Sequence, residues 1–186
     1  TQEALDEARR ARELLPDSDE AMRFLAWLLA EAGQPDAALR EARQAVERRP
    51  RFAENHNVLA YVYFRAGRFR EAAEEYGRVS ELQPDNAFAL HMRGTALHSA
   101  GDLDGAMAAY RAAIQVAPQS QTWANLGEVQ YTRGEMTEAL RSFEEAVRLA
   151  PASGAIRRAL GNARHRTGDT KGAKSDWLAA AELSRR

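Results

Sequence analysis

Cysteine is absent from the 186 residues of the sequence. Disulfide bonds and thiolate metal sites are therefore excluded, and cysteine usage does not indicate the redox state of the compartment. Long apolar runs are also missing, because the longest, around residues 24–30, is far shorter than the roughly 20 residues of a membrane-spanning helix. We expect no insertion into a membrane by this chain. Without a visible signal peptide, a cytoplasmic location is favoured and a periplasmic one stays open.

A marked excess of either charge is lacking as well. The sequence has 26 Lys and Arg residues against 27 Asp and Glu residues, which gives a net charge of −1. Proteins that bind nucleic acids usually carry a strong basic excess, so we expect no nucleic-acid partner. All but two of the basic residues are arginine, a bias that favours a GC-rich, bacterial source.

The motifs of common catalytic centres are missing too. The sequence has no Gly-x-Ser-x-Gly elbow, no glycine-rich phosphate loop and no His-Glu-x-x-His segment. His91 and His98 lie seven residues apart, about 10.5 Å along a helix axis. They cannot share a zinc ion, whose ligand nitrogens each lie at about 2.0–2.1 Å. We therefore expect a protein that is not an enzyme and that binds neither a cofactor nor a metal.

The sequence does contain a repeat with a period of 34 residues, in which a single interval is 33 residues long. Residues 123–151 show one unit most clearly: Trp-Ala-Asn-Leu-Gly, a break at Gly134, then Ala139 and Phe143 at helical spacing before Pro151. Proline ends a helix because it lacks an N–H group and clashes with the preceding turn. The repeat is marked by prolines at 16, 50, 84, 118 and 151, and by glycines at 33, 67, 101, 134 and 168.

This period predicts one domain over residues 1–186, with a half repeat at 1–18 and five helical hairpins. The hairpins span residues 19–52, 53–86, 87–119, 120–153 and 154–186, the last acting as a cap. The expected helices span residues 1–14, 19–32, 35–48, 53–66, 69–82, 87–100, 103–116, 120–133, 136–149, 154–167 and 170–183.

Two positions of the repeat hold small residues, which we expect to let the paired helices approach closely. A third position, the twenty-fourth, holds aromatic rings that can fill the space between hairpins; Ala42 is its weak member. The eighth position has Ala26, Ala60, Gly94, Gly127 and Gly161, the twentieth has Ala38, Ala72, Ala106, Ala139 and Ala173, and the twenty-fourth has Ala42, Tyr76, Tyr110, Phe143 and Trp177.

Two helices per 34 residues, with these small, aromatic and proline positions, resemble the tetratricopeptide repeat (TPR). The resemblance covers the whole chain. It implies an all-α, right-handed superhelical solenoid of antiparallel hairpins that binds a peptide or a segment of a partner protein in a concave groove lined by the first helix of each hairpin. Carried over by position, the predicted binding residues are Arg23, Trp27, Asn57, Tyr61, Phe64, Arg65, Phe88, His91, Thr95, His98, Glu128, Tyr131, Arg158 and Asn162.

We expect the centre of this groove in the second and third full repeats, where His91 and His98 would make binding depend on pH between about 5 and 8. Two known subtypes of the family do not fit. The chaperone-binding carboxylate clamp is absent, since Val58 stands where asparagine is needed and Phe88 where lysine is needed. The asparagine ladder of the sugar-transferase subtype is represented only by Asn125.

The favoured function is therefore a scaffold for protein interactions. The alternative is a regulatory or substrate-docking segment of a larger bacterial enzyme or signalling protein. Self-association is compatible with both. The apolar stripe around Leu5 in the first helix lacks the partner helix that its repeat would supply, which predicts either a homo-oligomer contact there or fraying of residues 1–15.

Several polar residues occupy positions that are apolar in most other repeats. His56 is expected to be a packed histidine. Arg93 replaces a leucine, so we expect it either to extend its charged group to solvent or to find an acceptor. Arg157, Arg164 and Lys174 are expected to face water on the outer side of the last hairpin.

Overall fold

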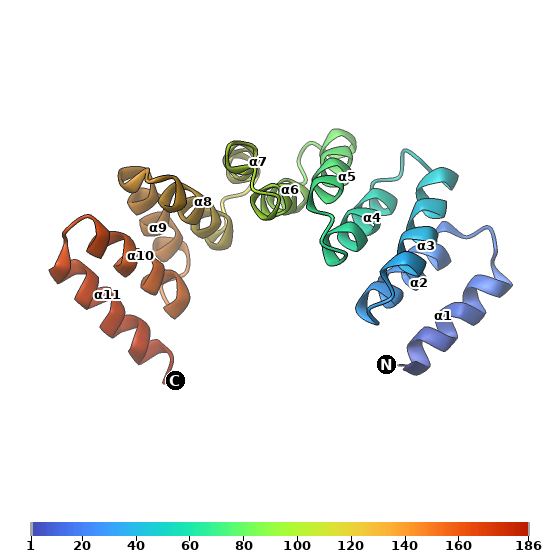
Figure 1. Cartoon of the computed structure of the whole chain (residues 1–186), viewed down its shortest axis with the longest axis horizontal. Helices are drawn as coiled ribbons and strands as arrows, with labels where there is room; N and C mark the ends of the chain where they lie inside the picture. Colours follow the sequence, from blue (N-terminus) through green and yellow to red (C-terminus); the bar gives the residue numbers. More distant parts are fainter. Residues whose placement is uncertain (1, 186) are drawn as a thin grey trace. The chain divides into compact units, whose positions relative to one another are not determined.

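The computed structural model describes residues 2–185, and that part of the chain folds into eleven α-helices and no strand (Figure 1). Each predicted helix is present, with ends that differ from the prediction by no more than one residue; the predicted start of the first helix at Thr1 lies outside the described residues. The helices are α1 (Gln2–Leu14), α2 (Asp19–Glu31), α3 (Pro35–Arg48), α4 (Ala53–Arg65), α5 (Phe69–Leu82), α6 (Ala87–Ser99), α7 (Leu103–Val116), α8 (Ser120–Arg133), α9 (Met136–Leu149), α10 (Gly154–Arg166) and α11 (Thr170–Leu183).

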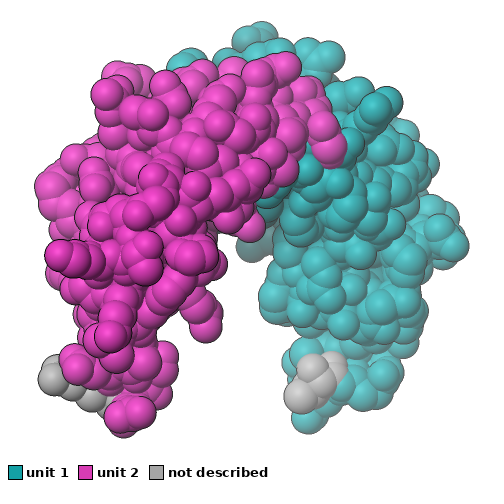
Figure 2. Space-filling model, turned by 60° about the vertical axis from the view of Figure 1, so that its left-hand side comes forward, with its two compact units in different colours: residues 1–100 teal, residues 101–186 magenta. Residues whose placement is uncertain are grey.

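The chain divides into two compact units, residues 1–100 with α1–α6 and residues 101–186 with α7–α11 (Figure 2). Within each unit, neighbouring helices in the chain pack against each other, most extensively in the hairpins α2–α3, α4–α5, α8–α9 and α10–α11. A single continuous solenoid over residues 1–186 and its right-handed superhelix stay predictions. None of the described helices is long and apolar enough to cross a membrane.

The turn inside each hairpin is made by a glycine with a left-handed backbone. Gly33, Gly67, Gly101, Gly134 and Gly168 have φ between 71° and 88°. This conformation is costly for residues with a Cβ atom, so the prediction of a left-handed cap at these positions is confirmed.

Small residues bring the two helices of a hairpin together, as predicted. The alanines at the twentieth position, among them Ala139, are 0% exposed. At the eighth position, a Cβ atom added to Gly127 would lie 3.0 Å from the ring of Phe143, and one added to Gly161 would lie 2.7 Å from the ring of Trp177. The aromatic ring at the twenty-fourth position therefore occupies the space that a side chain at the eighth would need.

Polar contacts join the two helices of three hairpins, each through the residue at the twenty-third position of the repeat. His56 Nδ1 lies 2.7 Å from Glu75 Oε2 in the α4–α5 hairpin. In the α8–α9 hairpin, the Ser142 hydroxyl donates to Gln130 Oε1 over 2.6 Å. His56 is buried, and its Nε2 lies 2.8 Å from the carbonyl oxygen of Pro50, so the prediction of a packed histidine is confirmed.

The third of these contacts corrects the prediction for the last hairpin. Arg164 Nη1 donates to Asp176 Oδ2 over 2.8 Å, and Arg157 Nη1 lies 3.8 Å from Asp176 Oδ1. Asp176 is only 5% exposed. Arg157 and Arg164 thus neutralise a buried carboxylate instead of simply facing water, whereas Lys174 is exposed as expected.

The first helix also differs from the prediction. Leu5 and Ala8 are 3% and 2% exposed and belong to the same core cluster as Leu25 and Leu29 of α2. The stripe around Leu5 is therefore not free to pair with another copy, because packing on the next hairpin already buries it. Homo-oligomerisation through this helix stays a prediction, but an unpaired apolar stripe no longer supports it.

Arg93 of α6 is exposed, and its guanidinium carbon lies 3.7 Å from the position of a Cβ atom on Gly77 of α5. The missing side chain at Gly77 leaves room for the arginine to pass along α5 to solvent. Arg93 therefore extends its charged group to solvent, which is the first of the two outcomes expected for it.

Candidate functional site

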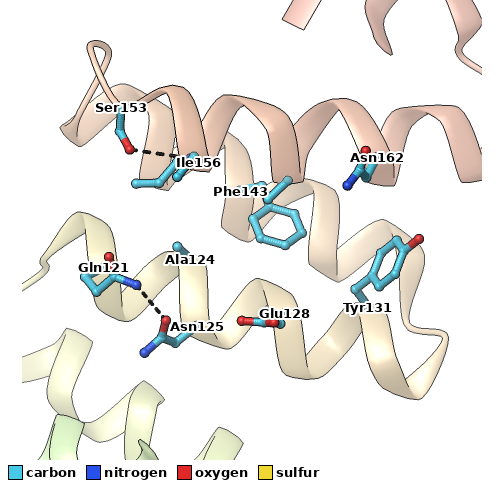
Figure 3. A pocket seen from close by; sticks show the side chains of 11 residues that line it. Gln121, Ala124, Asn125, Glu128, Tyr131, Phe143, Ser153, Ile156 and Asn162 are labelled. Atoms are coloured by element: carbon cyan, nitrogen blue, oxygen red, sulfur yellow. Dashed lines mark hydrogen bonds between the residues drawn. The ribbon is translucent and has the colours of Figure 1, made fainter. Parts of the chain in front are cut away.

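An open pocket of about 310 Å³ lies between α8 and α10, the first helices of two consecutive hairpins (Figure 3). It brings together three predicted binding residues, Glu128, Tyr131 and Asn162. The other lining residues are Gln121, Ala124, Asn125, Phe143, Ser153, Ala155, Ile156 and Ala159.

The floor of this pocket is apolar and built from three helices. Phe143 reaches it from α9 because Gly127 of α8 leaves space for the ring. Ile156 and Ala159 contribute from α10, whose first turn is capped by the Ser153 hydroxyl, which accepts from the Ile156 N–H over 3.4 Å. Phe143 is 3% exposed and packs with Leu160 in one core cluster, so the floor is rigid.

Polar side chains form the rim. On α8, Gln121 Nε2 donates to Asn125 Oδ1 over 2.8 Å, and the exposed Glu128 follows one turn later. On α10, Asn162 Oδ1 accepts a hydrogen bond of 3.0 Å from Trp177 Nε1. In Figure 3, Glu128 lies between Asn125 and Tyr131 along α8, and Asn162 lies on the facing helix.

Two arginines of α10 add positive charge beside the pocket. The guanidinium carbon of Arg166 lies 4.8 Å from the centre of the Tyr131 ring, a cation–π contact. The predicted binding residue Arg158 is exposed on the same helix but does not line the pocket.

A second pocket, of about 480 Å³, lies against α1, α2 and α4. It contains the predicted residues Arg23 and Trp27, and it adds Phe24, which was not among the predicted binding residues. Phe24 and Trp27 are 51% and 44% exposed. An aromatic residue just outside the packing stripe of the helix was the signal that could have identified Phe24.

Arg23 is held by its own neighbours in this second pocket. Its Nη1 donates to Asp19 Oδ2 over 2.7 Å and to Asn55 Oδ1 over 2.8 Å, and its guanidinium lies 5.0 Å from the centre of the Phe52 ring. These contacts tie α2 to the start of α4, so Arg23 already has a structural role.

The predicted centre of the groove is likewise engaged in contacts within the chain. Tyr61 and Arg65 both donate to the Glu31 carboxylate of the preceding repeat, and Arg65 Nη1 also donates to the Tyr61 hydroxyl over 2.8 Å. Burial and the hydrogen bond to Glu31 raise the pKa of Tyr61. Phe64 packs edge to face on Phe69, with ring centres 5.3 Å apart. These residues link neighbouring helices of unit 1.

The remaining predicted residues lie on α4 and α6. Asn57, His91, Thr95 and His98 are partly buried, whereas Phe88 is 58% exposed. The Thr95 hydroxyl donates to the His91 carbonyl within the helix. Burial lowers the pKa of His91, so its charge change is expected at a lower pH than that of an exposed histidine. Within residues 2–185, no three His, Asp or Glu side chains form a group that could hold a metal ion.

Comparison with solved structures places the fold among known proteins. MamA from Desulfovibrio magneticus RS-1 aligns with a TM-score of 0.81 at 20% identity, over 90% of this chain and 95% of that chain. YrrB, described as a TPR protein with an unusual peptide-binding site, aligns with a TM-score of 0.75 at 18% identity, over 97% of this chain and 93% of that chain. At these identities the likeness concerns the fold alone.

Similar sequences come from longer proteins. Human tetratricopeptide repeat protein 33 is 32% identical over 84 residues, which are 45% of this chain and 32% of that protein. Human protein O-mannosyl-transferase TMTC1 is 27% identical over 157 residues, 82% of this chain and 18% of that protein. The chain thus spans less than a third of either relative.

The profile of the tetratricopeptide repeat matches residues 2–53, 25–79, 57–121 and 124–185. These matches cover nearly the whole chain. The chain therefore belongs to the tetratricopeptide repeat family.

Proposed function

We propose that the chain binds an extended peptide, or an extended segment of a partner protein, in the pocket between α8 and α10. The observation that carries this proposal is the combination of a rigid apolar floor around Phe143 with a polar rim formed by Asn125, Glu128 and Asn162. Apolar anchors surrounded by a few placed polar groups are typical of binding sites.

The size of the pocket favours part of a longer ligand. Pockets that enclose small molecules have volumes of about 300–1,000 Å³, and this pocket, at about 310 Å³, is at the lower limit and open to solvent. It can take one or two side chains of a chain that continues along the helices. That a solved protein of the same fold is described as having a peptide-binding site is consistent with this proposal.

A second candidate is that these repeats dock substrates or regulators for a larger protein. The similarity to TMTC1 favours it, since that relative is a transferase of which the matched repeats form 18%. The coding sequence on either side of these residues tests it: a catalytic or signalling domain in the same reading frame supports it. The two candidates share the same pocket.

The proposal is tested by selecting binders from a phage library of random dodecapeptides. We expect peptides that bind the wild-type chain, and we expect Ala155→Trp to weaken their binding at least tenfold, because the indole would occupy the pocket. Ala155 is exposed, so the substitution should leave the fold intact. Affinity is measured by fluorescence anisotropy and folding by circular dichroism.

Two further variants complete this experiment. Ala124→Trp fills the pocket from α8 and should act like Ala155→Trp, whereas Arg141→Trp places the same indole on the exposed side of α9 and should leave binding unchanged. Failure to select any peptide, or wild-type affinity in both pocket variants, would show that the pocket is not the binding site.

A further inference from the structure

Among the described residues, the Glu128 carboxylate lines the pocket and lacks the arginine partner that several other acids of unit 2 have. Other carboxylates of unit 2 are already paired, over 2.9 Å in Glu135–Arg133, 3.1 Å in Glu144–Arg164 and 2.8 Å in Glu145–Arg148. Within residues 2–185, Glu128 forms no such ion pair, although it lines the pocket and is exposed. A ligand that covers Glu128 must remove water from a charge, which is unfavourable unless the ligand supplies a cation.

The side chains around Glu128 do little to offset the removal of water from its carboxylate. Asn125 is oriented by the hydrogen bond that its Oδ1 accepts from Gln121. Tyr131 has its ring against the guanidinium of Arg166. An ionised carboxylate only accepts hydrogen bonds, with two oxygens to satisfy. A lysine or arginine side chain of the ligand can satisfy both oxygens and the charge together.

The facing wall has the opposite polarity. Trp177 Nε1 is only a donor, so it fixes Asn162 with Oδ1 toward the indole. The two N–H groups of the Asn162 amide are then left to donate, which suits a carbonyl oxygen of the ligand backbone. Arg158 and Arg166 on the same helix disfavour a second ligand cation on that side. The geometry therefore suits one basic side chain directed at α8 and not a run of basic residues.

Taken with the apolar floor, these features specify the chemistry of the ligand. Resting on the proposed function, we infer that the pocket selects an extended peptide segment in which one lysine or arginine lies within two residues of an apolar anchor. The apolar side chain packs on Phe143 and Ile156, and the cation pairs with Glu128. Glu128 is thus the residue that determines the charge specificity of the site.

The test repeats the dodecapeptide selection on the wild type, on Glu128→Gln and on Glu128→Arg. We expect wild-type binders to be enriched in Lys or Arg within two positions of an apolar residue, and Glu128→Arg binders to be enriched in Asp or Glu instead. The affinity of a wild-type binder should fall about tenfold in Glu128→Gln, and the loss should shrink at high salt. Glu182→Gln, which neutralises an exposed acid of α11 outside the pocket, is the matched control and should bind like the wild type.

The outcomes separate this inference from the proposed function. If peptides are selected and Ala155→Trp blocks them, but they lack a basic residue and bind Glu128→Gln with unchanged affinity, the inference is wrong and the proposed function stands. If no peptide is selected, or if the pocket variants bind normally, both are wrong. Charge inversion in the peptides selected by Glu128→Arg, in a variant with an unchanged circular dichroism spectrum, supports both.

Discussion

Asp176→Asn is expected to destabilise the hairpin α10–α11 by about 3 kcal/mol, the lower end of the range for removing one partner of a buried ion pair. The side chain of Asp176 is 7% exposed and lies between Arg164 and Arg157, whose side chains are 27% and 26% exposed. The amide removes the negative charge but leaves both guanidinium groups in place. The lower end of this range applies because both arginine side chains are partly exposed, so that water can still solvate their charges.

Hydrogen exchange measures this effect where it occurs. A loss of about 3 kcal/mol corresponds to a roughly 100-fold decrease in the protection of amides in α10 and α11, with no change in α2–α5. The third full repeat supplies a matched control, because it has Leu90, Leu97 and Ala109 at the positions of Arg157, Arg164 and Asp176. Replacing all three charged residues by these apolar ones should restore most of the protection. Wild-type protection in Asp176→Asn alone would show that the carboxylate does not stabilise the hairpin.

Phe143→Ala is expected to lower the free energy of unfolding of unit 2 by about 3–5 kcal/mol, the usual cost of truncating a buried phenylalanine. The ring is 3% exposed, packs with Ala139, Leu160 and Ala163, and fills the space beside Gly127. Because the ring also forms the floor of the pocket, the same substitution should remove the surface on which the apolar side chain of the ligand packs. Urea denaturation followed by circular dichroism gives the stability change.

A second substitution shows whether the contact with Gly127 is responsible. In the wild type, a Cβ atom at residue 127 would lie 3.0 Å from the ring, closer than ordinary contacts, so Gly127→Ala gains helix propensity but strains the packing. In Phe143→Ala the ring is gone, and Gly127→Ala should stabilise the protein. We expect a coupling energy of roughly 1 kcal/mol or more between the two positions. Additive effects would contradict the proposed packing.

The sequence was sufficient for the elements whose cause is local. Helix ends were predicted to within a residue because Pro35 and the five glycines of the hairpin turns impose backbone geometry directly. The small residues at the eighth and twentieth positions recur at every hairpin, so their burial could be read from the period. These signals depend on single residues or fixed spacings and not on what another helix supplies.

The errors concern contacts between helices. Arg157 and Arg164 look like solvent-facing residues until Asp176, on the next helix, is seen between them. Leu5 was predicted to be available for pairing with another copy because its own partner helix is missing, but packing on α2 buries it. The contacts of Tyr61 and Arg65 with Glu31 of the preceding repeat could not be read from the spacing either, and the binding role of these two residues stays a prediction. The pocket floor at Phe143 could not be predicted, because the sequence does not show which side chains of α8, α9 and α10 meet.

The most direct test of the account is a crystal structure of the chain with a peptide selected from the dodecapeptide library. The account predicts an extended peptide between α8 and α10, with an apolar side chain on Phe143 and a lysine or arginine against Glu128. A peptide bound on the exposed surfaces of α9 and α11, with the pocket unoccupied, would contradict it.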